Sequence, residues 1–178
     1  LSLKKPVPIE EPLAQQELAR TNLEKLRQTA PQWYPLAAYL SGKGFDLYRN
    51  TALRYLPTGE AYLEDMLTTL DTAQRFIFLE YFIMAEGEIW DRLSDILCRK
   101  SRQGVEVKLI FDDFGSMMRM PNEKIDALQD AGVEVRVFNP VHHYVNRLYF
   151  NYRDHRKITC VDGDVAYTGG ANIADEYA

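Results

Sequence analysis

Apolar residues along this chain follow two alternating patterns, one typical of buried strands and the other of helices that cover a sheet. Three nearly continuous apolar runs predict strands at 75–84, 105–111 and 133–138. Before and between them, apolar residues at helical spacing predict helices at 60–71, 89–102 and 122–130. Strands that alternate with helices of about 10 to 15 residues predict an α/β fold. We expect a mixed, mostly parallel sheet whose right-handed crossovers place helices on both faces.

The carboxy-terminal part of the chain predicts a hairpin of strands. Residues 156–161 form a short strand-like run, and Asp162-Gly163 is a dipeptide that favours a two-residue hairpin turn. Residues 164–168 then return as the partner strand. The sheet is therefore expected to end in two neighbouring antiparallel strands.

The amino-terminal part has a different character. Its expected elements are a flexible, proline-rich lead-in, two helices and a strand, at 1–12, 13–27, 32–40 and 52–56. We assign the lead-in and helices to a region 1–44, and the regular strand and helix pattern to a domain 45–178. The chain starts without Met and stops abruptly at Ala178, so we expect a fragment of a longer protein, truncated at its carboxy terminus.

Composition limits the class of protein. A hydrophobic content of 46% and a charged content of 26% are ordinary for a globular domain. The net charge of -5 gives no general attraction to nucleic acid or anionic lipid. No run approaches the roughly 20 apolar residues of a membrane span. The two cysteines, Cys98 and Cys160, exclude a disulfide framework, and we interpret them as reduced core residues of a compartment such as the cytoplasm.

The candidate chemistry begins at His155. On a strand, side chains two residues apart share a face, so His155 and Lys157 are expected on one side while Ile158 and Cys160 pack into the core. A lysine beside a histidine can neutralise an oxyanion that the histidine attacks. The pair therefore predicts phosphoryl-type transfer through a covalent phosphohistidine.

Glycines and an amide extend the predicted phosphate site. Gly169 and Gly170 lack a Cβ, which lets the backbone approach a ligand closely. Asn172 can donate its side-chain amide to the same anion. Basic residues gather around the histidine and indicate a bound anion rather than a wrapped polyanion: Arg147, Arg153, Arg156 and Lys157.

Three acidic residues are candidates at the site or at its periphery: Asp162, Glu80 and Asp112. Asp162 is either a proton donor or the residue that makes the turn, and the turn is favoured. Glu80 and Asp112 lie in or at the end of buried strands, and parallel sheets collect ligands at the carboxyl ends of their strands. Asp112 is thus a neighbour of the site or, equally well, a cap of the following turn.

Two further histidines, His142 and His143, precede the motif and raise the question of a metal site with His155. No carboxylate beside them has the spacing of a common metal motif. We expect them to be exposed or to line the substrate, and we predict no bound metal.

The segment 151–177, with its His-x-Lys pair, Asp-Gly turn and Gly-Gly-Ala-Asn, resembles the first catalytic motif of the phospholipase D superfamily. It is most similar to bacterial cardiolipin synthases of the Gram-positive type. The likeness runs back through 111–116, 79–83 and 56–59, and covers roughly 45–178. Many superfamily members have Ser where this chain has Gly170, and the glycine favours the synthase branch over the nucleases.

The resemblance implies a reaction in which a histidine attacks phosphatidylglycerol, releases glycerol and passes the phosphatidyl group to a second phosphatidylglycerol, giving cardiolipin. It makes His155 the nucleophile or its acid/base partner. It assigns the phosphate oxygens to Lys157 and Asn172, and Asp162 completes the motif. No cofactor is implied.

The resemblance also implies partners. The family builds its site from two such motifs, in one chain or in a homodimer, and this chain contains one. We expect the amino-terminal catalytic half of a membrane-bound synthase, with the catalytic domain on the cytoplasmic side. The fragment itself is expected to be soluble and inactive or nearly so, and no nucleic acid is expected as a partner. Two alternatives stay open: another phosphodiesterase (a lipid hydrolase or a dimeric nuclease), or a non-catalytic lipid- or anion-binding module.

Overall fold

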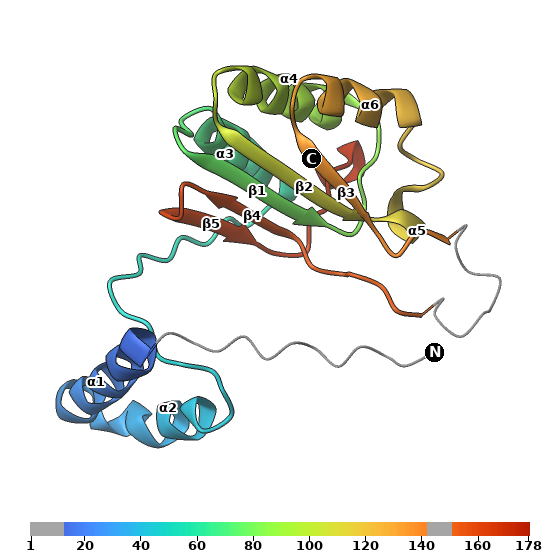
Figure 1. Ribbon diagram of the computed structural model, residues 1–178. Helices are drawn as coiled ribbons and strands as arrows, with labels where there is room; N and C mark the ends of the chain where they lie inside the picture. Colours follow the sequence, from blue (N-terminus) through green and yellow to red (C-terminus); the bar gives the residue numbers. More distant parts are fainter. Residues whose placement is uncertain (1–12, 142–150) are drawn as a thin grey trace. The chain divides into compact units, whose positions relative to one another are not determined.

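The computed structural model describes residues 13–141 and 151–178 (Figure 1). The chain divides into two compact units, Leu1–Arg54 and Tyr55–Ala178, which are described separately. The predicted lead-in 1–12 lies outside the described residues.

The first unit contains two helices joined by a tight turn. The helices are α1 (Leu13–Thr29) and α2 (Tyr34–Ser41), and the 3-10 turn η1 (Pro31–Trp33) lies between them. Both predicted helices are therefore confirmed. The side-chain amide of Asn22 donates to the Leu47 carbonyl at 2.8 Å and ties the following segment back to α1. The strand predicted at 52–56 is wrong. Leu53 and Tyr55 are almost fully exposed, and alternation makes a strand only where a neighbour accepts its backbone hydrogen bonds.

The second unit is a five-stranded sheet with helices. Its elements are α3 (Gly59–Leu70), β1 (Phe76–Tyr81), α4 (Glu88–Arg102), β2 (Glu106–Asp112), α5 (Asp113–Ser116), α6 (Asn122–Asp130), β3 (Glu134–Phe138), β4 (Ile158–Val161), β5 (Val165–Thr168) and the 3-10 turn η4 (Asp175–Tyr177). The strand order is β3-β2-β1-β4-β5. β1, β2 and β3 are parallel, and β4 runs antiparallel to both β1 and β5. The expected mixed, mostly parallel α/β sheet is confirmed.

The described helices α3, α4 and α6 cover one face of the sheet (Figure 1). On β1 the side chains of Ile77, Leu79 and Tyr81 are buried, while Phe78 and Glu80 are partly exposed on the other face. We expected helices on both faces. The strands β1, β2 and β3 follow one another in one direction across the sheet. Successive right-handed crossovers therefore place the two connecting helices, α4 and α6, on the same side.

The face of β4 that packs against the core is not the face that we expected. Its antiparallel register pairs Thr159 with Leu79 and Val161 with Ile77, and both of these β4 residues are buried on the helix-covered face. Ile158 and Cys160 are only partly buried on the open face, instead of packing into the core. Lys157, two residues before Thr159, is buried with the core side.

A cluster of hydroxyl groups holds β4 to the core. The fully buried Tyr81 hydroxyl lies 2.8 Å from the Tyr62 hydroxyl and 2.8 Å from the Thr159 hydroxyl, and it contacts the Met66 sulfur at 3.2 Å. Each buried hydroxyl therefore has a partner, which removes the cost of hiding it from water.

We expect Tyr81→Phe to lower the free energy of unfolding by about 1–2 kcal/mol, because Thr159 and Tyr62 lose a buried hydrogen-bond partner. Chemical denaturation measures the change. Tyr55→Phe is the matched control, since Tyr55 is 86% exposed and its hydroxyl can bond to water. Equal stability of the two variants would contradict the role of the hydroxyl cluster.

Candidate active site

His155 and Lys157 lie at the carboxyl end of β1. They belong to the segment that enters β4, and Ile158, the first residue of β4, pairs with Glu80 near the end of β1. The Lys157 Nζ atom is 3.1 Å from His155 Nδ1 and 2.7 Å from the His155 carbonyl oxygen. Lys157 is 4% exposed, whereas His155 is open to solvent. The structure thus brings the predicted pair together, with the histidine accessible.

The Phe82 ring lies close to both side chains. Its ring centroid is 4.7 Å from the His155 ring and 5.3 Å from Lys157 Nζ. The ring face attracts the ammonium group and limits the positions that the imidazole can adopt. We did not select Phe82 from the sequence. Its signal is its place just after a buried strand of a parallel sheet, where ligand-binding residues gather.

The charge on Lys157 determines which nitrogen of His155 carries the proton. Burial lowers the pKa of Lys157, and the nearby Asp154 carboxylate opposes that shift. A charged ammonium has only donor hydrogens, so Nδ1 must accept from it. A neutral His155 ring that accepts from Lys157 at Nδ1 carries its proton on Nε2, and in this tautomer Nε2 can donate a hydrogen bond but cannot attack.

Asn172 is placed by two hydrogen bonds. Its Oδ1 accepts from the Ile83 backbone N–H at 3.0 Å, and its Nδ2 donates to the Tyr177 hydroxyl at 2.9 Å. An isolated parallel bridge between Met84 and Ile173 lies beside it. Asn172 therefore ties the segment after β5 to the end of β1, and it retains a second Nδ2 hydrogen.

The two glycines follow β5 directly. The register that pairs Thr168 with Ile158 continues toward Gly169 and Lys157. A Cβ added to Gly169 or Gly170 would meet no atom within 4 Å. The space at the Cβ positions of both glycines is therefore open, and no part of the described chain requires glycine there.

Asp162 lies at the opposite end of β4 from His155, and the structure does not bring the two together. Its carboxylate accepts from the backbone N–H groups of Gln74, Arg75 and Phe76 at 2.9, 2.7 and 2.8 Å. Those hydrogen bonds, that of Phe76 first, lower the pKa of Asp162. Its φ of 55° helps to form a connection of three residues between β4 and β5, not two as expected. Asp162 acts as the turn residue that anchors the start of β1.

Asp112 fulfils both interpretations that the sequence left open. Its fully buried carboxylate caps α5 by accepting from Phe114 N–H at 2.9 Å. It also accepts from Arg153 Nη1 at 3.1 Å and from Asp154 N–H at 2.9 Å. The end of β2 is thereby connected to the two residues that precede His155. Arg153 takes part in that connection and also donates to the Asn139 carbonyl at 3.0 Å.

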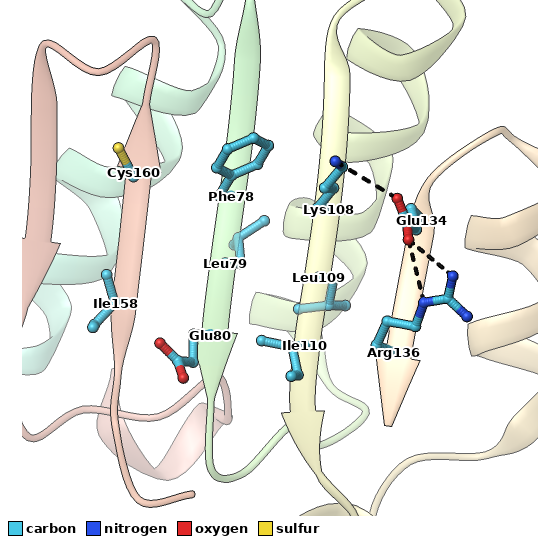
Figure 2. A pocket seen from close by; sticks show the side chains of 10 residues that line it. All are labelled: Phe78, Leu79, Glu80, Lys108, Leu109, Ile110, Glu134, Arg136, Ile158 and Cys160. Carbon is cyan, nitrogen blue, oxygen red and sulfur yellow. Dashed lines mark hydrogen bonds and ion pairs between the residues drawn. The ribbon is translucent and has the colours of Figure 1, made fainter. Parts of the chain in front are cut away.

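Glu80 lies on the open face of the sheet, in a cavity of about 320 Å³ (Figure 2). Figure 2 shows its carboxylate near the end of β1, beside Ile158. Arg156 Nη2 is 2.5 Å from Glu80 Oε1. Burial and the neighbouring Asp154 carboxylate raise the pKa of Glu80 to about 7. Burial acts to raise the pKa of Asp154, but hydrogen bonds from Glu80 and Arg156 outweigh it and lower that pKa.

His142 and His143 lie outside the described residues, as does Arg147. Within residues 13–141 and 151–178, no three His, Cys, Asp or Glu side chains come together as a metal site would require. The helices of this same part of the chain are all too short or too polar to cross a bilayer.

Comparison with known proteins gives a consistent family. A family model described as cardiolipin synthase, PLD-like domain, matches residues 66–177. An uncharacterised protein of Streptococcus mutans serotype c is 42% identical over 87% of this chain and 34% of its own length. Cardiolipin synthases of Oceanobacillus iheyensis and Geobacillus kaustophilus are 37% and 39% identical, over 79% and 83% of this chain.

The chain spans only part of these relatives, covering 27% and 30% of the two synthases. Among solved structures, a phospholipase D family member, Nuc from Salmonella typhimurium, is similar with a TM-score of 0.46 and 20% identity. The similarity covers 64% of this chain and 66% of that one.

We expect nitrogen NMR of the neutral imidazole to show His155 with its proton on Nε2, because charged Lys157 donates to Nδ1. Lys157→Met removes that donor and should give a mixture of the two tautomers. Lys108→Met, on the open face of β2, is the control and should leave His155 unchanged. A ring protonated mainly on Nδ1 in the unsubstituted chain would contradict the proposed contact.

Proposed function

Because the chain belongs to the family of cardiolipin synthase domains of phospholipase D type, we propose that its site transfers a phosphatidyl group between alcohols. The substrate is phosphatidylglycerol and the product is cardiolipin. The observation that carries the proposal is the contact of Lys157 Nζ with His155 Nδ1 over the Phe82 ring. It places an accessible histidine, able to transfer a proton or to attack, next to a buried ammonium group that can bind the phosphate oxygens.

The reaction has two displacements. In the first, a histidine Nε2 attacks phosphorus, a P–N bond forms, and the P–O bond to glycerol breaks. The departing glycerol oxygen takes a proton from the histidine of the second motif. In the second, that histidine takes the proton from a hydroxyl of another phosphatidylglycerol, the new P–O bond forms and the P–N bond breaks. No oxidant, metal or cofactor takes part in this scheme.

His155 can serve in either role, and Lys157 determines when. While Lys157 donates to Nδ1, the Nε2–H of His155 is a proton donor. For His155 to attack, the ammonium group must move to the phosphate oxygens and the ring proton must shift to Nδ1. The second Nδ2 hydrogen of Asn172 can donate to the same phosphate, and the open space at Gly169 and Gly170 leaves room for it.

A second motif must complete the site. The described chain supplies one accessible histidine, and the open space at Gly169 and Gly170 is where a facing half would approach. We infer that the second half comes from the same polypeptide or from a second copy. The 178-residue chain is then inactive, or nearly so, as a monomer.

The substrate lies in a bilayer, and the first unit has a surface that suits one. Four aromatic side chains there are more than half exposed: Trp33, Tyr39, Phe45 and Tyr48. Lys and Arg outnumber Asp and Glu over residues 13–54, although the whole chain is acidic. Amphipathic rings with basic neighbours favour the interface of an anionic membrane. We infer that this surface contacts the cytoplasmic side of the cell membrane in the full-length protein.

An assay of the full-length protein with phosphatidylglycerol should yield cardiolipin and glycerol, with no cleavage of single-stranded DNA. His155→Ala should lower the rate by ~10³-fold or more, since it removes a nucleophile or a proton-transfer group. Met118→Ala, at a residue that is 90% exposed, is the control with unchanged activity. Cardiolipin made by the monomeric 178-residue chain would overturn the two-motif requirement, and DNA cleavage without lipid transfer would favour a nuclease.

The 178-residue chain should bind vesicles that contain phosphatidylglycerol more tightly than pure phosphatidylcholine vesicles. Trp33→Ser with Tyr39→Ser should weaken binding by ~30-fold, because the two buried rings each contribute on the order of 1 kcal/mol. His155→Ala and Met118→Ser are controls that keep this surface intact. Equal binding to both kinds of vesicle, or no loss in the double variant, would refute the proposed membrane contact.

A further inference from the structure

Two carboxyl groups from distant parts of the chain influence each other beside His155. Glu80 comes from β1, Asp154 comes from the segment that enters β4, and each shifts the pKa of the other. Arg156 bridges them: its Nη2 is 2.5 Å from Glu80 Oε1, and its Nε is 3.1 Å from Asp154 Oδ1. A hydrogen bond between two carboxyl groups needs a proton on one of them.

The surroundings favour one proton on this pair. Asp154 is 7% exposed, and the Glu80 side chain is 20% exposed. Two charged carboxylates in contact repel each other, and partial burial weakens the screening by water. The Asp154 carboxylate accepts three hydrogen bonds from Arg156, from its backbone N–H, Nε and Nη2, whereas Glu80 contacts Arg156 only through Nη2, so the negative charge is favoured on Asp154. The proton therefore stays on Glu80.

The charged groups that share the cavity with Glu80 are paired with one another. Lys108 on β2 and Arg136 on β3 both contact Glu134, as the dashed lines of Figure 2 show. Arg156 is the cation that contacts Glu80. The protonation of Glu80 is thus set mainly by Asp154 and Arg156.

The pair is joined to His155 through the backbone. Asp154 N–H donates to Asp112, and Arg156 N–H donates to Asp154 Oδ1 at 3.2 Å. His155 lies between these two donors. The Asp154 carboxylate therefore holds the backbone of Arg156, the residue after His155, while the Asp154 backbone is held by Asp112.

We propose that Glu80 is a positioning residue: its carboxyl donates a proton to Asp154, and this bond holds the Asp154–Arg156 segment so that His155 meets Lys157. Its catalytic meaning rests on the proposed function, but the positioning itself does not. Loss of the proton would put two carboxylates in contact and loosen the segment. The site therefore contains a pH-sensitive clamp on its histidine.

The pH range follows from the direction of the shift. The pKa of Glu80 is raised from 4.5 to about 7, so the folded chain binds this proton more tightly than the unfolded chain. The stability it contributes is fully present below pH 4.5 and is lost as pH rises through about 7. Unfolding of the 178-residue chain should therefore show this loss.

Glu80→Gln is the informative substitution, because an amide donates to Asp154 and accepts from Arg156 without titrating. Its melting temperature relative to the unsubstituted chain should rise steadily between pH 4.5 and 8. Glu80→Ala should be destabilised at low pH, where Gln is not. Glu134→Gln is the matched control, a glutamate on β3 in the same cavity, and should show no such trend. A pH-independent difference between Glu80→Gln and the unsubstituted chain would overturn the proposal.

Carbon NMR of the Glu80 carboxyl gives a second measurement. The midpoint should lie near 7, and the contact between the His155 and Phe82 rings should weaken over the same pH range, but not in Glu80→Gln. A midpoint near 4.5, or a ring contact with the same pH response in Glu80→Gln, would refute the clamp. Both measurements use the chain without substrate, so failure of the lipid assay leaves them unaffected.

Discussion

The buried carboxylate of Asp112 is the contact on which the arrangement of the site depends. Removing a carboxylate from water costs several kcal/mol unless donors surround it. Here the donors are Phe114 N–H, Asp154 N–H and the Arg153 guanidinium, and they come from two separate parts of the chain. Satisfying one charge therefore forces the end of β2, the first turn of α5 and the approach to β4 to meet. His155 is the next residue after that meeting point.

The short segment from Asp154 to Lys157, which follows this anchor, makes contacts on both faces of the sheet. Lys157 is buried on the core side and contacts His155 over Phe82. Asp154 and Arg156 contact Glu80, which lines the cavity on the open face. The conformation of His155 is thus tied both to the charge that would hold a phosphate and to a proton on the far side of the strand. Binding of an anion and a change of pH would act on the same few residues.

Much of the fold could be predicted from periodicity, because buried strands and amphipathic helices have strong local patterns. Three features could not. Alternation shows that β4 has two faces but not which one is the core, and only its register with β1 buries Thr159. Crossover direction, not composition, decides that the described helices share one face. Asp162 and His155 are close in sequence, but β4 separates them, and the roles of Phe82 and Glu80 come from strand neighbours distant in sequence.

The most direct test of this account is the contact between the His155 and Phe82 rings in an Asp112→Asn variant, measured by proton NMR. The rings lie 4.7 Å apart, close enough for a strong cross-peak. The account predicts that the cross-peak is present in the unsubstituted chain and in an Asp130→Asn control on the exposed end of α6. It should be lost in Asp112→Asn, while the signals of β1 and the core remain. An unchanged cross-peak in Asp112→Asn would contradict the claim that this carboxylate positions the site.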